Sequence, residues 1–278
     1  MNGKVRGKVA QGLLNIVLIF FAFVSIYPMI FTLLTSFKDN EQFFKNFWGF
    51  PNPIIWTNYR DAFNTLLKYI GNSFFIAFVS IALIILISAM AGYAFCRLKF
   101  PGKEFFYVAI VALMMIPGLL QLIPRFALLK DFGMLDTYRG IILGYVAGGL
   151  TMGIMVIRAS FESQPEELYE AARIDGSGEI RSFFKIALPL VKPTLGTVAI
   201  INLLNIWNDY LWPLIVTSDE SKFTMALGLI KFKTSFGNTT LYGPTFAGYM
   251  VASLPLIILF LIFMDYFMEG LTAGAVKM

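Results

Sequence analysis

The sequence predicts an all-α membrane protein in which one transmembrane domain, residues 1–278, contains six spanning helices. Three observations lead to this prediction. Of the 278 residues, 58% are hydrophobic and 14% are charged, whereas a soluble domain carries roughly 25% charged residues. Six long runs carry almost no charge. Charged residues gather instead in the segment between two of these runs, residues 158–192, which holds five basic and six acidic side chains.

The first span is predicted over residues 13–37, an uncharged run that follows Lys4, Arg6 and Lys8. A helix needs about 20 mostly apolar residues to cross the hydrocarbon core of a bilayer. Lipid offers no partner to backbone polar groups, so such a run must be helical. The apolar core of a signal peptide has only about 7–15 residues. We therefore expect an uncleaved first span.

The second, third and fourth spans are predicted over residues 70–96, 105–124 and 140–157, none of which carries a charge. The fourth run has glycines at intervals of four. Small residues at that spacing let helix backbones approach closely inside a membrane, so they predict close packing within a bundle. These glycines are Gly140, Gly144 and Gly148, with Gly149 and Gly153 as a further pair.

The fifth and sixth spans are predicted over residues 194–218 and 246–264, and the fifth contains the only charge inside any run, Asp209. Prolines inside or near the ends of spans predict kinks, because each removes a backbone hydrogen bond. Tryptophans near the predicted outer boundaries predict an aromatic belt at the lipid headgroups. These residues are Pro28, Pro117, Pro213 and Pro255, and Trp48, Trp56, Trp207 and Trp212.

The orientation follows from the short segments richest in Lys and Arg, which stay on the cytoplasmic side. Residues 1–10 and residues 97–104 hold three basic residues each. The N-terminus is therefore expected inside, and six spans return the C-terminus to the same side. This topology makes the charged loop between spans four and five, residues 158–193, cytoplasmic. The net charge of +5 then suits lipid headgroups better than nucleic acid.

The residue types present exclude several kinds of chemistry. The chain has one cysteine and no histidine, so neither an internal disulfide nor a zinc site is expected. It has no phosphate loop of the form G-x-x-x-x-G-K-[ST]. A membrane enzyme would need a clustered nucleophile, base or metal, and an ion-coupled secondary transporter would need ionisable groups within its spans. We expect no metal, cofactor or catalytic site in this chain.

The charged loop itself is predicted to form two short helices. Ser163 is expected to cap the first, with Pro165 and two glutamates in its opening turn, and Gly176 is expected to end it. The second is expected to begin near Ser177 and to lead through Pro189 into span five. A lipid-surface helix usually carries Lys and Arg on its polar face. The first helix here is acidic, so a groove in a protein partner is favoured.

The loop also carries a recognisable pattern: Glu170-Ala171-Ala172, three residues, Gly176, nine residues, and then Ile186-Ala187-Leu188-Pro189. This pattern resembles the "EAA" signature of permease subunits in binding-protein-dependent ABC importers. Residues 72–103 and 207–214 look like the corresponding parts of sugar permeases. Residues 270–278 resemble the tail of the smaller permease of maltose-type carbohydrate importers, in which a glycine commonly stands in place of Met278.

This resemblance implies a type I ABC importer permease fold in a multi-pass protein of the cell (inner, cytoplasmic) membrane. It implies import of a mono- or oligosaccharide, with a polyol or a sugar phosphate as the alternative. The implied partners are two copies of an ATPase subunit, a second homologous permease, an extracellular or periplasmic sugar-binding protein, and membrane lipid. ATPase coupling is assigned through the resemblance to Glu170, Ala171, Ala172, Gly176, Ile186, Leu188 and Pro189.

A candidate translocation pathway lies on span five, which carries Asn202, Asn205, Asn208 and Asp209. Three of them, Asn202, Asn205 and Asp209, are three and four positions apart and so are expected on one helix face. Polar groups inside a membrane usually turn toward a pathway or a partner helix. The alternative for Asp209 is a snorkelling or helix-pairing role near the outer interface.

Overall fold

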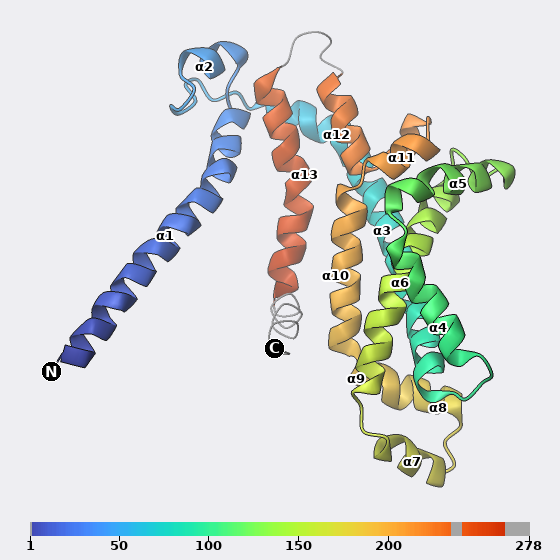
Figure 1. Ribbon diagram of the computed structural model, residues 1–278. Helices are drawn as coiled ribbons and strands as arrows, with labels where there is room; N and C mark the ends of the chain where they lie inside the picture. The colour runs from blue at the N-terminus through green and yellow to red at the C-terminus, as the bar shows by residue number, and fades with distance from the viewer. Residues whose placement is uncertain (1, 235–240, 265–278) are drawn as a thin grey trace. The chain divides into compact units, whose positions relative to one another are not determined.

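The computed structural model describes residues 2–234 and 241–264, and every regular element in those ranges is helical (Figure 1). The candidate permease tail, residues 270–278, lies outside the described residues. The chain divides into two compact units. The first comprises residues 1–67 and 229–255, and the second comprises residues 68–228 and 256–278.

The first unit contains α1 (Asn2–Ser36), α2 (Asn40–Lys45), the first turns of α3 (Thr57–Arg97), the end of α12 (Met225–Thr234) and most of α13 (Tyr242–Ile262). The buried Lys38 fixes the connection between α1 and α2, because its Nζ donates to the carbonyls of Asn46 at 2.8 Å and Phe47 at 3.0 Å. Phe43 on α2 stacks on Tyr242 with ring centroids 4.0 Å apart. These contacts hold the loop at residues 38–56 in a defined shape.

The second unit holds the rest of α3 and a long series of shorter helices. They are α4 (Lys103–Ala112), η1 (Leu113–Met115), α5 (Gly118–Asp131), α6 (Tyr138–Glu162), α7 (Glu167–Ile174), α8 (Glu179–Ser182), η2 (Phe183–Ala187), α9 (Leu188–Leu190), α10 (Lys192–Asn208), α11 (Leu211–Val216) and η3 (Glu220–Lys222), followed by the first turn of α12 and, later in the chain, the end of α13.

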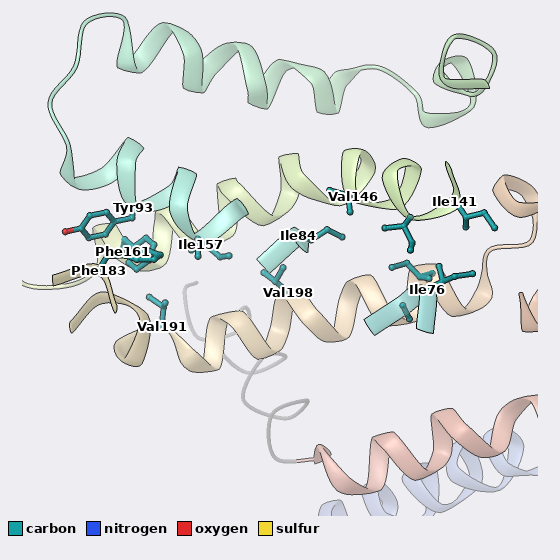
Figure 2. Close-up of a cluster of buried hydrophobic side chains, with 14 of the residues drawn as sticks. Ile76, Ile84, Tyr93, Ile141, Val146, Ile157, Phe161, Phe183, Val191 and Val198 are labelled. Atoms are coloured by element: carbon teal, nitrogen blue, oxygen red, sulfur yellow. The ribbon is translucent and has the colours of Figure 1, made fainter. Parts of the chain in front are cut away.

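The core of the second unit forms where α3, α6 and α10 pack together (Figure 2). The predicted glycines explain how closely they approach. A Cβ added at Gly149 would lie 2.5 Å from Oδ1 of Asn202, and one added at Gly153 would lie 2.4 Å from Oγ of Ser88. Ten of the buried apolar side chains are Ile76, Ile84, Tyr93, Ile141, Val146, Ile157, Phe161, Phe183, Val191 and Val198.

The apolar runs correspond to helices, but not all of them to straight ones. Four helices are long and apolar enough to cross a membrane by themselves: Gln11–Ser36 of α1, and α3, α6 and α13. Two further candidates are bent pairs, Lys103–Met115 with Gly118–Asp131 at 106° and Glu179–Leu190 with Lys192–Asn208 at 73°. By length and composition, the described residues therefore hold four candidate spans, or up to six if each bent pair is one span.

The third run was predicted as one span with a kink at Pro117, and the structure divides it there into two helices that meet at 106°. The helix breaks at Ile116, whose φ of −85° and ψ of 116° are extended. Pro117 follows, and a proline ring disfavours helical geometry in the residue before it. The chain then starts α5 in a new direction.

The fifth run is also divided, because α10 ends at Asn208 and α11 begins at Leu211.

Two of the four tryptophans expected in a headgroup belt are buried here instead. Trp207 and Trp212 are each only 3% exposed. Trp212 fits against Gly144, and its Nε1 donates to the carbonyl of Ile141 at 3.2 Å. Close packing on α6, made possible by glycine, thus replaces the interfacial position predicted for this ring.

Candidate functional site

The charged loop folds as two short helices joined at a glycine, as the sequence predicts. Gly176 has φ of +74°, a left-handed conformation that favours glycine. The N–H of Ser177 bonds the carbonyl of Ala172 at 2.8 Å, and the N–H of Gly176 bonds that of Arg173 at 3.0 Å. This pair of bonds is a Schellman motif, which satisfies the last carbonyls of α7.

Two boundaries of the loop differ from the prediction. Ser163 does not cap α7: its hydroxyl donates back to the carbonyl of Ser160 at 2.8 Å, and α7 begins at Glu167. The reason is that α6 continues to Glu162, beyond the predicted end of span four, so that Ser163 becomes its C-terminal cap. The second helix begins at Glu179 rather than near Ser177.

One side of the loop packs into the bundle. Tyr169 and Phe183 are buried, and their rings lie 6.4 Å and 5.2 Å from the ring of Tyr93 on α3. The Tyr93 hydroxyl donates to Oε2 of Glu179 at 2.8 Å. α3 therefore contacts both helices of the loop.

Arg97, the last residue of α3, makes the most extensive contacts with the loop. Its side chain is 6% exposed and forms an ion pair with Glu166. Its Nη2 donates to the carbonyls of Phe161 and Gln164, at 2.7 Å and 2.9 Å. The guanidinium lies 4.1 Å from the ring centroid of Tyr169. One side chain thus holds the end of α6 and the start of α7.

The Tyr169 hydroxyl completes this cluster by donating to Oε1 of Gln164. Burial raises the pKa of Tyr169, so the hydroxyl stays protonated and remains a donor at neutral pH. We call Arg97, Gln164, Glu166 and Tyr169 the Arg97 cluster. Sequence reasoning missed it, because Arg97 reads as one more basic residue at the end of a span.

The other side of the loop exposes an apolar surface that nothing covers within the described chain. Leu168 is 44% exposed, Ile174 86%, Ile180 77% and Phe184 57%. The coupling residues suggested by the resemblance divide between the two sides. Ala172 is buried, Ile186 and Leu188 are half-buried, and Glu170, Ala171, Gly176 and Pro189 are exposed.

The loop joins α10 through a corner at which the two helical segments meet at 73°. Phe183–Ala187 is a turn of π-helix, a wide turn that is often found at functional sites. Pro189 follows and cannot bond back to the carbonyl of Lys185, since it lacks an N–H. The Thr194 hydroxyl, at the start of α10, lies 2.8 Å from that of Ser160 on α6. This contact joins α6 to α10 close to the two ends of the loop.

A second candidate site is a pocket of about 340 Å³ between α5, α6, α10 and α11. Three of the predicted pathway residues line it: Asn202, Asn205 and Asp209. The fourth does not, because Asn208 is exposed and its Nδ2 donates to the carbonyl of Leu204 at 2.8 Å. Asp209 was expected on the span-five helix, but it follows the end of α10.

Asp209 instead caps α11, since its Oδ1 accepts from the backbone N–H of Leu211 at 2.9 Å and of Trp212 at 3.3 Å. Arg125 of α5 faces the same pocket, with its guanidinium 4.5 Å from the ring of Trp212 and its Nη2 donating to the carbonyl of Gly144. Sequence reasoning missed Arg125, because span three was expected to end one residue earlier.

Comparison with known proteins identifies the family. Residues 84–272 match the family model described as "Binding-protein-dependent transport system inner membrane component". The chain belongs to this family.

Two relatives are similar over most of this chain. The arabinooligosaccharides transport system permease protein AraQ of Halalkalibacterium halodurans is 35% identical over 99% of both chains. The diacetylchitobiose uptake system permease protein NgcG of Streptomyces coelicolor is 31% identical over 94% of this chain and 87% of its own.

The fold also has a counterpart among solved structures. One chain of a bacterial ABC transporter involved in the import of the acidic polysaccharide alginate superposes with a TM-score of 0.80. The match covers 94% of this chain and 98% of that chain, at 24% sequence identity. The likeness shows a shared ABC importer permease fold.

Proposed function

We propose that this chain is the transmembrane subunit of an ATP-driven importer that carries a sugar delivered by an extracellular binding protein. The relatives AraQ and NgcG, named for arabinooligosaccharide and diacetylchitobiose transport, support a saccharide as the substrate. Relatives named for trehalose and for melibiose, raffinose and stachyose point to the same class.

In this proposal the chain crosses the cytoplasmic membrane six times, with each bent pair counted as one span and both termini inside. The positive segments at residues 1–10 and 97–104 support this orientation. The Arg97 cluster ties the second of these segments to the charged loop, so both lie at the same membrane face. The loop is then cytoplasmic.

The partners in this proposal are a second, homologous permease, two ATPase subunits and a sugar-binding protein outside the membrane. The observation that carries the proposal is the exposed apolar surface of α7 and α8 on a loop whose other side is firmly packed. We assign this surface, together with Glu170, Ala171 and Gly176, to docking in a cleft of the ATPase subunit, a helix-in-groove mode of recognition.

Coupling then follows from the packing. ATP binding closes the ATPase pair and displaces the docked loop. The Arg97 cluster transmits that displacement to α3, while the half-buried Ile186 and Leu188 and the corner at Pro189 transmit it to α10. The permease pair is the two-state element whose equilibrium the ATPase and the sugar-loaded binding protein both bias.

Two glycines in the link between α7 and α8 give a matched test. A Cβ would meet no atom within 4 Å at Gly176 or at Gly178, so neither substitution causes a clash. Gly176 has φ of +74° but Gly178 has φ of −74°, and the left-handed conformation costs alanine roughly 1–2 kcal/mol. Gly176→Ala should weaken co-purification of the ATPase and slow sugar uptake several-fold, whereas Gly178→Ala should change neither.

Both variants should insert into the membrane in normal amounts, which immunoblotting of membrane fractions checks. Equal uptake in Gly176→Ala and Gly178→Ala would argue against a coupling role for this turn.

A further inference from the structure

We infer that the pocket between α5, α6, α10 and α11 is a binding subsite for an uncharged saccharide, carried by this chain itself. The inference deepens the proposed function and rests on it. The pocket is lined by groups from four helices, among them Arg125, Tyr145, Asn202, Asn205 and Asp209. Its volume of about 340 Å³ lies in the range of small-molecule sites.

The glycines of α6 create this space in two ways. Gly144 and Gly149 leave room for side chains from neighbouring helices. An added Cβ would lie 2.3 Å from the ring of Trp212 at Gly144 and 2.5 Å from Oδ1 of Asn202 at Gly149. No side chain packs closely against Gly148, because the nearest atom to its added Cβ is Nη2 of Arg125, at 4.0 Å. The missing side chain at Gly148 therefore leaves open volume in the pocket wall.

The polar groups in the pocket suit hydroxyl recognition. The Tyr145 hydroxyl is buried beside the Asp209 carboxylate and makes no hydrogen bond of ordinary geometry to it or to another described residue, so it retains bonding capacity for a sugar hydroxyl or a water. Arg125 and Asp209 each use one atom on the backbone. The guanidinium fork of Arg125, the second carboxylate oxygen of Asp209 and the Asn205 amide offer both donors and acceptors, as a sugar hydroxyl does.

The charges in the pocket indicate which saccharides it accepts. Among the described residues, Arg125 and Asp209 are the only charged ones that line it, and their formal charges cancel. A uronate would gain attraction to Arg125 but would also place its carboxylate near Asp209, in a partly buried site where charge repulsion is poorly screened. A neutral sugar meets no such opposition, so the pocket discriminates against acidic saccharides.

Asp209→Asn tests this inference with little disturbance of the fold. Asparagine retains the side-chain oxygen that caps α11, while the negative charge is removed. Asp131→Asn is the matched control, because it makes the same change of charge at an exposed residue of α5 that does not line the pocket. Gly148→Leu is the second variant and fills the open volume.

The measurement is uptake into proteoliposomes that contain the full chain, assembled with the partner permease, ATPase and binding protein. The probes are radiolabelled arabinotriose, diacetylchitobiose and trehalose, with an alginate trisaccharide as the acidic competitor added inside the vesicles. The inward side is chosen so that the competitor reaches the permease without passing the binding protein. We expect KM for the transported neutral sugar to rise at least fivefold in Asp209→Asn and Gly148→Leu. We also expect the acidic trisaccharide to inhibit Asp209→Asn at least fivefold more strongly than the wild type.

Asp131→Asn should match the wild type in both respects. Unchanged KM and unchanged inhibition in both pocket variants would overturn the inference and leave the proposed function standing. Stronger inhibition of the wild type by the acidic trisaccharide than by neutral sugars would also overturn it. If the wild-type assembly hydrolyses ATP but transports no saccharide, the proposed function itself fails.

Discussion

The guanidinium of Arg97 lies 4.1 Å from the ring centroid of Tyr169, so the last residue of α3 holds the first helix of the charged loop. The same guanidinium bonds the carbonyls of Phe161 and Gln164. Lysine cannot reproduce this arrangement, because an ammonium group lacks the planar fork that bonds two acceptors while stacking on a ring.

Arg97→Lys should therefore lower both loop stability and coupling. Loss of a charged hydrogen bond to a buried acceptor costs about 1–3 kcal/mol. We expect the ATPase rate of the reconstituted importer to lose most of its stimulation by sugar-loaded binding protein, with membrane insertion unchanged. Lys99→Gln, a neutral substitution at an exposed neighbour, is the control. Full stimulation in Arg97→Lys would remove this residue from the coupling path.

Two adjacent phenylalanines allow docking to be separated from folding. Phe183 is 6% exposed and Phe184 is 57% exposed. Phe183→Ser should destabilise the isolated chain by about 3–5 kcal/mol, seen as a large fall in its melting temperature in detergent. Phe184→Ser should leave the melting temperature nearly unchanged, because surface substitutions usually stay within about 0.5 kcal/mol.

In assembly with the ATPase subunit, by contrast, substitution at the exposed position should have the specific effect. Phe184→Ser should lose most of its ATPase partner in pull-down experiments while remaining folded. Retention of the partner by Phe184→Ser at wild-type levels would mean that the exposed apolar surface has another purpose.

Gly144→Ala tests the glycine packing of α6. An added Cβ would lie 2.3 Å from the ring of Trp212, which is 3% exposed and has no room to retreat without disturbing its neighbours. Overpacking of this kind costs about 1–3 kcal/mol, so the melting temperature should fall and Trp212 fluorescence should shift to the red. Gly12→Ala, where a Cβ meets no atom within 4 Å, should have no such effect.

Asp136 lies in the loop that precedes α6, and its hydrogen bonds make the free energy of unfolding depend on pH. Its Oδ1 accepts from the backbone N–H of Ser218 and Asp219 and from the hydroxyl of Thr217. Those bonds to backbone N–H groups hold the pKa of Asp136 below its ordinary value. A lowered folded-state pKa contributes stability that is present above the unfolded value of about 3.9 and is lost as pH falls through the folded value.

The melting temperature should therefore fall as the pH is lowered from 5 toward 3, and Asp136→Asn should lose part of this dependence. Asparagine suits the position because it tolerates the φ of 55° found there. Identical pH profiles for wild type and Asp136→Asn would show that this cap contributes nothing to stability.

Much of the fold follows from residue order alone, and the departures have local causes. The six apolar runs were visible because lipid requires long uncharged helices, and Gly176 was visible because a left-handed turn requires glycine. A kink was predicted at Pro117, but the sequence does not distinguish the sharp break found there from the continuous helices at two other prolines, Pro28 inside α1 and Pro255 inside α13.

The candidate sites were predictable only in part. The sequence places the residues proposed for coupling in one loop, but it does not show that Ala172 is buried while Ala171 is exposed. Nor does it show that Arg97, far away in the chain, secures that loop. The pocket joins Arg125 on α5 to Asp209 beyond α10, and only the packed structure brings them to one cavity. Trp212 was assigned to the lipid interface, because a sequence does not show that Gly144 leaves space for its ring.

The central claim, that the loop of α7 and α8 meets an ATPase inside the cell, is tested most directly by cross-linking from Ile180. This residue is 77% exposed, and the chain has a single native cysteine, Cys96, so Ile180→Cys in a Cys96→Ser background gives one reactive site. We predict a cross-link to the ATPase subunit whose yield changes when ATP is added, and no labelling of intact cells by a membrane-impermeant maleimide. Labelling from outside, or no cross-link to the ATPase in an assembled importer, would contradict the claim.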